Sequence, residues 1–308
     1  MSSLTGAGSL PPLDLTRAPE GGEIGPVQSG WRLAVREFAS NKLAVMGVGI
    51  LLFFVLFSFV GPVFYHGNYL TSNLAATNLP PGAGYPLGTN NQGYDGLALL
   101  MKGGQAALEV GFMSAVIAIV IGALYGAISG LAGGIVDAVL MRVVDVFLSI
   151  PFLFIVLIVA VRFGASVLSL SLLIGAFSWL VPARLVRGEV LTLRVRDFVA
   201  AARVAGASQT RLIARHLLPN ALGVVIVNVT FQVADAILYV AALGFLGFGL
   251  QWPNQDWGDL LSNGITYLQD GYWWQIWPVG ACIVLVVMAC NLIGDAARDS
   301  LDVRLRRR

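Results

Sequence analysis

The polar side chains best placed for chemistry lie on one face of a long apolar segment. Asn228, Gln232 and Asp235 are spaced by four and three residues, so on a helix they share a face. Ionisable groups within a membrane are costly and usually face a cavity or a partner. Two interpretations are open: a stripe lining a solute path that holds an amine or amide, or an interhelical hydrogen bond. We adopt the solute path, because an ionised carboxylate in lipid is hard to tolerate without water.

The other reactive residue types do not form a site. The only histidines are His66 and His216, and the topology derived below puts them on opposite sides of a membrane. Cys282 and Cys290 share one apolar run and give neither a disulfide framework nor a zinc pattern. The chain also lacks the Gly-x-x-x-x-Gly-Lys-Ser/Thr phosphate loop. We therefore expect no catalytic residues, no metal site and no cofactor bound by this chain.

The composition of the 308 residues points to a membrane protein. Hydrophobic residues make up 57% and charged residues 12%, against about 25% charged in soluble domains. A soluble fold this apolar could not cover its surface with polar groups. The net charge of +2 gives no reason to expect nucleic acid or another acidic partner.

Six apolar runs are long enough to cross a bilayer, which takes about 20 residues of helix. Backbone groups find no water in lipid, so the runs should be α-helices and the fold all-α. The runs are 43–64, 106–131, 144–161, 167–185, 221–250 and 276–293. Before them, residues 1–42 form a tail. We predict that the first part of this tail is disordered, because it holds little apolar surface.

Lys and Arg are distributed unevenly among the connections. With the N-terminus inside, all but Lys102 and Arg162 of the 19 basic residues fall on the cytoplasmic side. Cytoplasmic segments carry such an excess of positive charge. We therefore predict that both termini are cytoplasmic, that 65–105 is extracytoplasmic and that 294–308 is a basic tail.

Two further patterns concern packing. Gly122, Gly126 and Gly130 lie four residues apart and predict a smooth stripe against which a neighbouring helix packs closely. Five of the seven tryptophans lie between 252 and 277, as expected for rings at a membrane–water interface. A role in stacking against a solute is the alternative.

The connection 187–219 is the most informative segment. Residues 198–205 are good helix formers, Gly206 stands where a C-cap would, and Ser208 can cap a second helix over 209–217. We expect Pro219 to end that helix. Such a helix–turn–helix suits insertion into a groove on a partner protein. An amphipathic hairpin lying on anionic lipid fits the pattern equally.

The sequence of this connection resembles the EAA loop of binding-protein-dependent ATP-binding-cassette (ABC) importer permeases. It reads DFVAAARVAGAS over 197–208 and RHLLPN over 215–220. The chain departs from the loop pattern at Ala200, in place of Glu, and at His216, where Ile is usual. The resemblance implies that the loop docks an ATPase subunit. The residues implied are Asp197, Ala200, Ala201, Ala202, Arg203, Gly206, Ala207, Ser208, Arg211 and Pro219.

Three other stretches resemble the C-type subunit of the dipeptide, oligopeptide and nickel permeases. They are 243–260, which begins LGFLGFGLQWP, the end of the last apolar run with its tail over 291–305, and PLGTN over 86–90. The resemblance implies a type I ABC importer fold of six helices in a bacterial plasma membrane. It also implies four partner chains: a second permease, two ATPases that bind ATP and Mg²⁺, and an extracytoplasmic solute-binding protein.

The transported solute is expected to be a short peptide. Nickel, glutathione and haem permeases of similar appearance remain alternatives within the resemblance. An ATP-independent secondary carrier would need several intramembrane ionisable groups and usually inverted repeats, and one mid-membrane acid with no repeat is found. A membrane enzyme would need a catalytic set at one depth, which the sequence does not offer.

Overall fold

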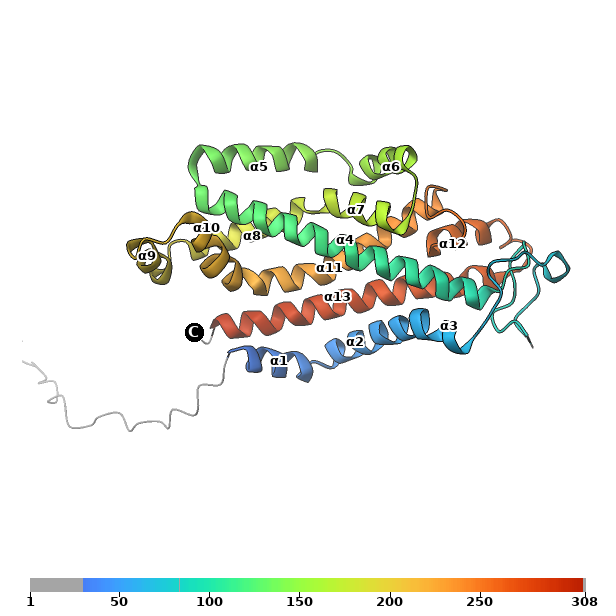
Figure 1. The fold of residues 1–308 in the computed structure, drawn as a ribbon. Coiled ribbons are helices and arrows are strands. Elements are labelled where there is room, and N and C mark those ends of the chain that lie inside the picture. Colours follow the sequence, from blue (N-terminus) through green and yellow to red (C-terminus); the bar gives the residue numbers. More distant parts are fainter. Residues whose placement is uncertain (1–29, 83, 307–308) are drawn as a thin grey trace, which may run out of the picture.

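The computed structural model describes residues 30–82 and 84–306 (Figure 1). Within these ranges the secondary structure is helical, with two isolated bridges and no strand. The helices are α1 (Gly30–Ser40), α2 (Lys42–Val55), α3 (Gly61–Phe64), α4 (Gly96–Ala132), α5 (Gly134–Leu148), α6 (Phe152–Phe163), α7 (Val167–Ser178), α8 (Leu180–Leu193), α9 (Asp197–Val204), α10 (Gln209–Leu212), α11 (Leu218–Phe245), α12 (Trp257–Ile265) and α13 (Trp277–Arg306). Short π or 3-10 turns occupy Leu56–Val60, Leu74–Ala76, Ile213–Leu217 and Trp273–Gln275.

The expectation of six spans is confirmed when two bent helix pairs each count as one span. Four continuous segments are long and apolar enough to cross a membrane: Lys42–Phe64, Gly96–Ala132, Gly223–Phe245 and Trp273–Ser300. The pair α5 and α6 is bent by 77°, and the pair α7 and α8 by 42°. The described chain is thus an all-α membrane protein, as predicted.

Prolines account for both bends. Pro151 precedes α6 as its N-cap residue, and a proline disfavours helical geometry in the residue before it. Pro182 lies in the first turn of α8, where its missing N–H breaks continuity with α7. The predicted third span, 144–161, therefore divides into two helices rather than one.

Several helix ends differ from those expected. The α4 helix begins at Gly96 rather than at 106, because Asp95 caps it by accepting from the backbone N–H groups of Leu97 and Ala98 at 2.9 and 3.1 Å. The polar residues that follow, including Lys102, concealed this start. The α5 helix begins at Gly134 rather than at 144, so the charged Arg142 lies within the helix.

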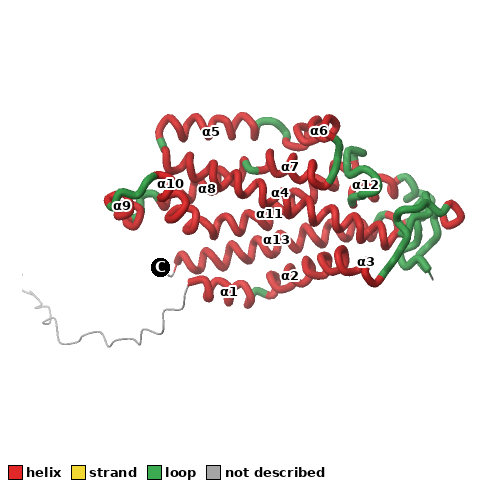
Figure 2. The backbone as a smooth tube through the Cα atoms, in the orientation of Figure 1, coloured by secondary structure: helices red, strands yellow, loops and turns green. Residues whose placement is uncertain are grey.

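The predicted tails are also partly helical. The amphipathic α1 lies inside the range 1–42 and packs along α13, and α13 continues through most of 294–308. The disorder predicted for the first part of the tail concerns residues outside those described. Helices α9 and α10, the beginning of α1 and the end of α13 lie at one end of the bundle (Figure 1). The loops before α4 and around α12 gather at the other end (Figure 2).

The α4 helix is the centre of the bundle and contacts α7, α8 and α11 along its length. Its glycine stripe makes the predicted close contact, and the partner is α8. A Cβ atom added at Gly126 would lie 2.3 Å from the carbonyl oxygen of Ala183. At Gly122 it would lie 2.7 Å from Cβ of Pro182, and at Gly130 it would lie 2.9 Å from Val190. The two backbones are too close for a side chain at these positions.

Gly126→Ala should destabilise the protein, whereas Gly188→Ala should stabilise it. The added methyl group at Gly126 meets backbone atoms, and overpacking of this kind costs about 1–3 kcal/mol. Gly188 lies on α8 with no atom within 4 Å of an added Cβ, so alanine there gains about 0.5–1 kcal/mol from helix propensity. The thermal unfolding midpoints of both variants in one detergent check the opposite signs. Equal midpoints would contradict the close packing of α4 on α8.

Candidate functional site

The predicted helix–turn–helix is present at one end of the bundle. The α9 helix ends in a left-handed turn at Gly206, with φ of +81°, and the N–H of Ala207 donates to the carbonyl of Ala202 at 3.0 Å. This is the capping arrangement that glycine favours at a helix C-terminus. Ser208 caps α10 by accepting from the N–H of Arg211 at 3.3 Å. The bend and both caps are therefore confirmed.

One face of this loop is anchored in the bundle. Val199, Leu212 and Leu217 are at most 1% exposed and form a cluster with Val186 of α8 and Ala127 of α4. Ala202 and Ala207, two of the predicted docking residues, are partly buried against the same cluster. The loop is therefore packed onto the ends of α4 and α8 and can move with them.

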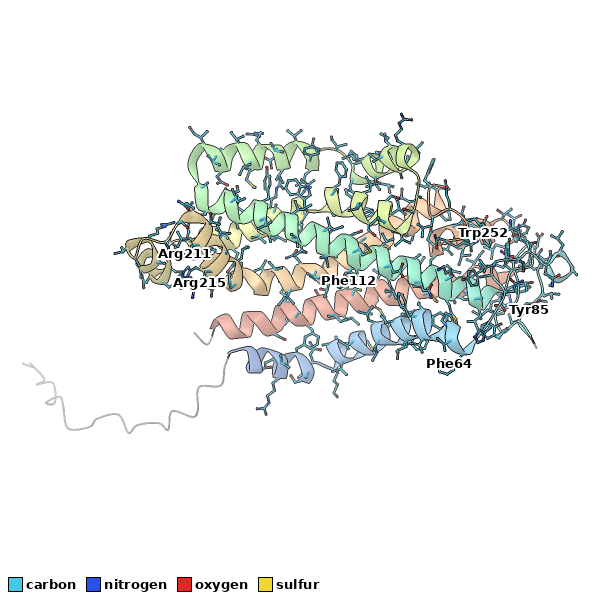
Figure 3. All side chains as sticks on the ribbon, in the orientation of Figure 1. Phe64, Tyr85, Phe112, Arg211, Arg215 and Trp252 are labelled. Carbon is cyan, nitrogen blue, oxygen red and sulfur yellow. The ribbon has the colours of Figure 1, made fainter. Side chains whose placement is uncertain are left out.

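The opposite face of the loop is exposed and combines apolar and cationic side chains. Val204 is 90% exposed and Phe198 is 41% exposed, in a segment that also carries several charged side chains. Arg211 and Arg215 extend from the same end of the molecule (Figure 3). The exposed members of the predicted docking set are Asp197, Ala200, Ala201, Arg203, Gly206, Ser208, Arg211 and Pro219.

Pro219 does not end the second helix, contrary to the prediction. It lies in the first turn of α11, which continues directly from α10 through the π turn Ile213–Leu217. The wider π turn accommodates the missing proline N–H. The Asn220 side chain also donates to the carbonyl of His216 at 2.6 Å. The loop is therefore joined rigidly to α11 rather than by a flexible break.

Two arginines of the predicted connection, and Arg184 at the end of the predicted fourth span, are bonded within the bundle. Arg187 forms a two-point ion pair with Asp137 of α5, with N–O distances of 2.5 and 2.6 Å. Arg194 donates to the carbonyl of Gly130 at 2.9 Å, and Arg184 pairs with Asp145. Asp145 also lies 3.9 Å from the guanidinium of Arg142, three residues before it on α5. Asp137 was missed because it lay in a presumed connection.

The three polar residues of α11 share a side of the helix but differ in exposure. Asn228 donates to the carbonyl of Val224 within its own helix at 2.8 Å, and Gln232 is 8% exposed. Asp235 is exposed on the surface of the subunit. Among the described residues, no side chain forms a hydrogen bond or ion pair with Asp235. Its carboxylate thus faces outward from this chain.

The end of the bundle opposite the α9–α10 loop is held by residues for which the sequence suggested other roles. Trp257 is 1% exposed and donates its indole N–H to the carbonyl of Leu100 at 3.0 Å. The interfacial belt therefore fits the exposed Trp252, Trp273 and Trp277 but is wrong for Trp257. A tryptophan beside a helix cap is hard to distinguish by sequence from one at an interface.

Asp256 stabilises the same end of the bundle through buried hydrogen bonds. It is fully buried and accepts from the N–H groups of Leu250 and Asp259, both at 2.9 Å. Burial raises the pKa of its carboxyl to about 6, although the two backbone hydrogen bonds act in the opposite direction. Burial also raises the pKa of the neighbouring Asp259.

Thermal stability should consequently rise as the pH falls from about 7.5 to about 5. The folded protein then takes up a proton at Asp256 that the unfolded chain, with a pKa near 3.8, does not bind. Asp256→Asn should lower stability at both pH values, because the amide can accept only one of the two N–H donors well. It should also reduce the difference between them. Unfolding midpoints of the variant that change with pH as steeply as those of the wild type would contradict this role.

No metal centre is found among the residues described, where no three His, Cys, Asp or Glu side chains gather. His66 follows α3 and His216 lies in the π turn after α10, and these elements lie at opposite ends of the bundle (Figure 1). Cys282 and Cys290 are buried free thiols of α13.

Comparison with known proteins covers nearly the whole chain. Residues 118–307 match the family described as the binding-protein-dependent transport system inner membrane component. Residues 29–81 match the N-terminal transmembrane domain of oligopeptide transport permease C. The dipeptide transport system permease protein DppC of Bacillus subtilis (strain 168) is 35% identical over 91% of this chain and 86% of its own length. The oligopeptide transport system permease protein OppC of Escherichia coli (strain K12) is 38% identical over 91% of this chain and 93% of its own.

Proposed function

The chain belongs to the family of binding-protein-dependent transport system inner membrane components, and from this we propose that it is the C-type permease subunit of an ABC importer for short peptides. It spans the membrane several times and forms one half of the pore. The membrane is the bacterial plasma membrane. Energy comes from separate ATPase subunits, since this chain carries no phosphate-binding loop.

The observation that carries the proposal is the two-sided loop of α9 and α10. One face is packed on α4 and α8, and the other exposes Val204, Phe198 and arginines at this end of the bundle. An apolar centre with a polar rim is the usual anatomy of a protein interface. A lipid-bound hairpin would instead need a continuous apolar face turned toward the lipid. In this loop the apolar face packs against the bundle.

The complex would contain a second, related permease, two ATPase subunits and an extracytoplasmic solute-binding protein. ATP and Mg²⁺ would be bound by the ATPases alone. Because α10 continues into α11 through the π turn, closure of the ATPase dimer would move the loop and α11 together and so reorient the pore. ATP drives this only if the two pore states bind the ATPase dimer differently.

Gly206→Pro should uncouple ATP hydrolysis from import. Proline holds φ near −65°, far from the +81° observed, and it removes the N–H that donates to Arg203 at 2.9 Å. Gly206→Asn is the matched control, because asparagine tolerates the left-handed conformation at a helix C-terminus. Import and ATP hydrolysis are measured together in membranes. Unchanged import by the proline variant would contradict the proposal that the loop and α11 move together.

Short peptides are the proposed solutes because the relatives above are named as dipeptide and oligopeptide permeases. On the described surface, the outward carboxylate of Asp235 suits the ammonium group of a peptide, with Asn228 and Gln232 on the same side of α11. Permeases for nickel, glutathione or haem are the alternatives within the family. An ATP-independent carrier is the alternative of another class.

Affinity purification of the chain from native membranes, followed by mass spectrometry, tests the proposal. We expect a second permease, ATPase subunits and a solute-binding protein, and the ligand of the last would name the solute. Recovery of the chain alone in several mild detergents would favour the carrier.

A further inference from the structure

The α5 helix is attached to the bundle mainly by polar contacts. Asp137 and Val144 are its only buried residues, whereas Ile135, Val139 and Val146 are 84%, 58% and 55% exposed. In a membrane span, exposed apolar side chains face lipid, and a charged side chain usually faces the bundle and pairs with a partner. Here the buried anchor is a carboxylate, so polar bonds fix the position of α5 beside α4 and α8 (Figure 1).

The carboxylate of Asp137 is bonded to two helices at once. Arg187 of α8 donates Nε to Oδ1 at 2.5 Å and Nη2 to Oδ2 at 2.6 Å. The hydroxyl of Ser129 on α4, itself fully buried, donates to Oδ1 at 2.5 Å. A bidentate pair of this kind fixes orientation as well as distance.

Weaker bonds extend the same attachment along α5. Arg184, one turn before Arg187, pairs with Asp145, and the hydroxyl of Tyr125 on α4 donates to the carbonyl of Leu140 at 2.9 Å. The Arg184 pair is exposed to solvent, with both side chains more than 40% accessible, and exposed pairs contribute little. Asp137 with Arg187 is therefore the principal link.

This link is joined to the α9–α10 loop through one short helix. Arg187 lies in α8, which ends at Leu193, and the C-cap residue Arg194 donates to the carbonyl of Gly130. The α9 helix begins three residues after Arg194, at Asp197. On the other side, α5 leads through its 77° bend into α6, whose Val156 and Ala160 pack with Ala236 and Val240 of α11.

We propose that Asp137 and Arg187 are positioning residues that make α5 and α6 follow the α9–α10 loop. This proposal rests on the proposed function, because it concerns how ATPase-driven movement of the loop spreads through the subunit. Movement of α8 is transferred to α5 by the ion pair, and through α6 it reaches the part of α11 that carries Asp235. Without the pair, α5 has little apolar contact to hold it to α8.

The test uses the complete transporter reconstituted in nanodiscs and proteoliposomes. The double variant Asp137→Asn with Arg187→Gln removes both charges, so neither buried charge is left unpaired. We expect binding-protein-stimulated ATP hydrolysis to persist while peptide imported per ATP hydrolysed falls about tenfold, within the usual range of coupling between sites. Arg142→Gln is the matched control, because Arg142 is 80% exposed and its pair with Asp145 spans 3.9 Å. That variant should keep the wild-type ratio.

A distance measurement separates positioning from general stability. Spin labels are attached at Val139→Cys on α5 and Gly188→Cys on α8, two exposed or unobstructed positions. We expect their distance distribution to stay the same with and without ATP in the wild-type background and to broaden with ATP in the double variant. A double variant with the wild-type import ratio and an unchanged distribution would overturn the proposal. A wild-type complex without ATP-dependent import would instead contradict the proposed function.

Discussion

Val204→Glu is expected to abolish retention of the ATPase subunits and, with it, ATP-dependent import. Val204 is 90% exposed at the end of α9, so the folded subunit accepts a charge there without repacking. In the docked complex, the same carboxylate would be buried in an apolar contact without a partner. Loss at the centre of an interface is typically about 2 kcal/mol or more, which is about thirtyfold in affinity.

The measurement is the amount of ATPase that co-purifies with each variant at equal permease yield. Leu74→Glu is the matched control, because Leu74 is 77% exposed in the outer segment before α4. It should retain the ATPase fully. Equal retention by Val204→Glu and Leu74→Glu would show that the loop surface around Val204 is not the docking site.

Asp235→Asn is expected to reduce import of peptides with a free amino group by about tenfold or more. A hydrogen bond to a charged group is worth about 1.5–3 kcal/mol, and the carboxylate of Asp235 has no cationic partner among the described residues. The same peptides with acetylated amino groups should be imported equally by variant and wild type. Initial import rates over a range of peptide concentrations provide the comparison.

Leu238→Asn controls for a general effect of an amide on α11, because Leu238 is exposed and lies three residues after Asp235. It should alter import of free and acetylated peptides by the same factor. If Asp235→Asn also reduced both peptides equally, Asp235 would have a structural role. No reduction for either peptide would place Asp235 outside the solute path.

The helices and the bend of the loop could be predicted because they depend on local signals. Apolar length identified the spans, and Gly206 with Ser208 marked a C-cap and an N-cap. The glycine stripe of α4 predicted close packing, although only the structure shows that α8 is the partner.

The remainder depended on tertiary contacts. Pro219 signals a helix end by itself, but a π turn allows α10 to continue into α11. Asp137 and Arg187 are fifty residues apart, and nothing local connects them. Trp257 is of a residue type common at membrane interfaces, yet the carbonyl of Leu100 on α4 provides it with a buried hydrogen-bond acceptor. Each of these features requires knowing which helices are neighbours.

Peptide uptake by proteoliposomes containing the complete purified complex distinguishes an ATP-driven importer from a secondary carrier. Labelled peptide and the solute-binding protein are supplied outside the vesicles. In one sample ATP is enclosed inside, where it reaches the ATPase subunits. In the other, a proton gradient is imposed without ATP. We expect uptake that requires ATP and the binding protein and that is unaffected by collapse of the gradient. Uptake driven by the proton gradient in the absence of ATP would contradict it and identify a secondary carrier.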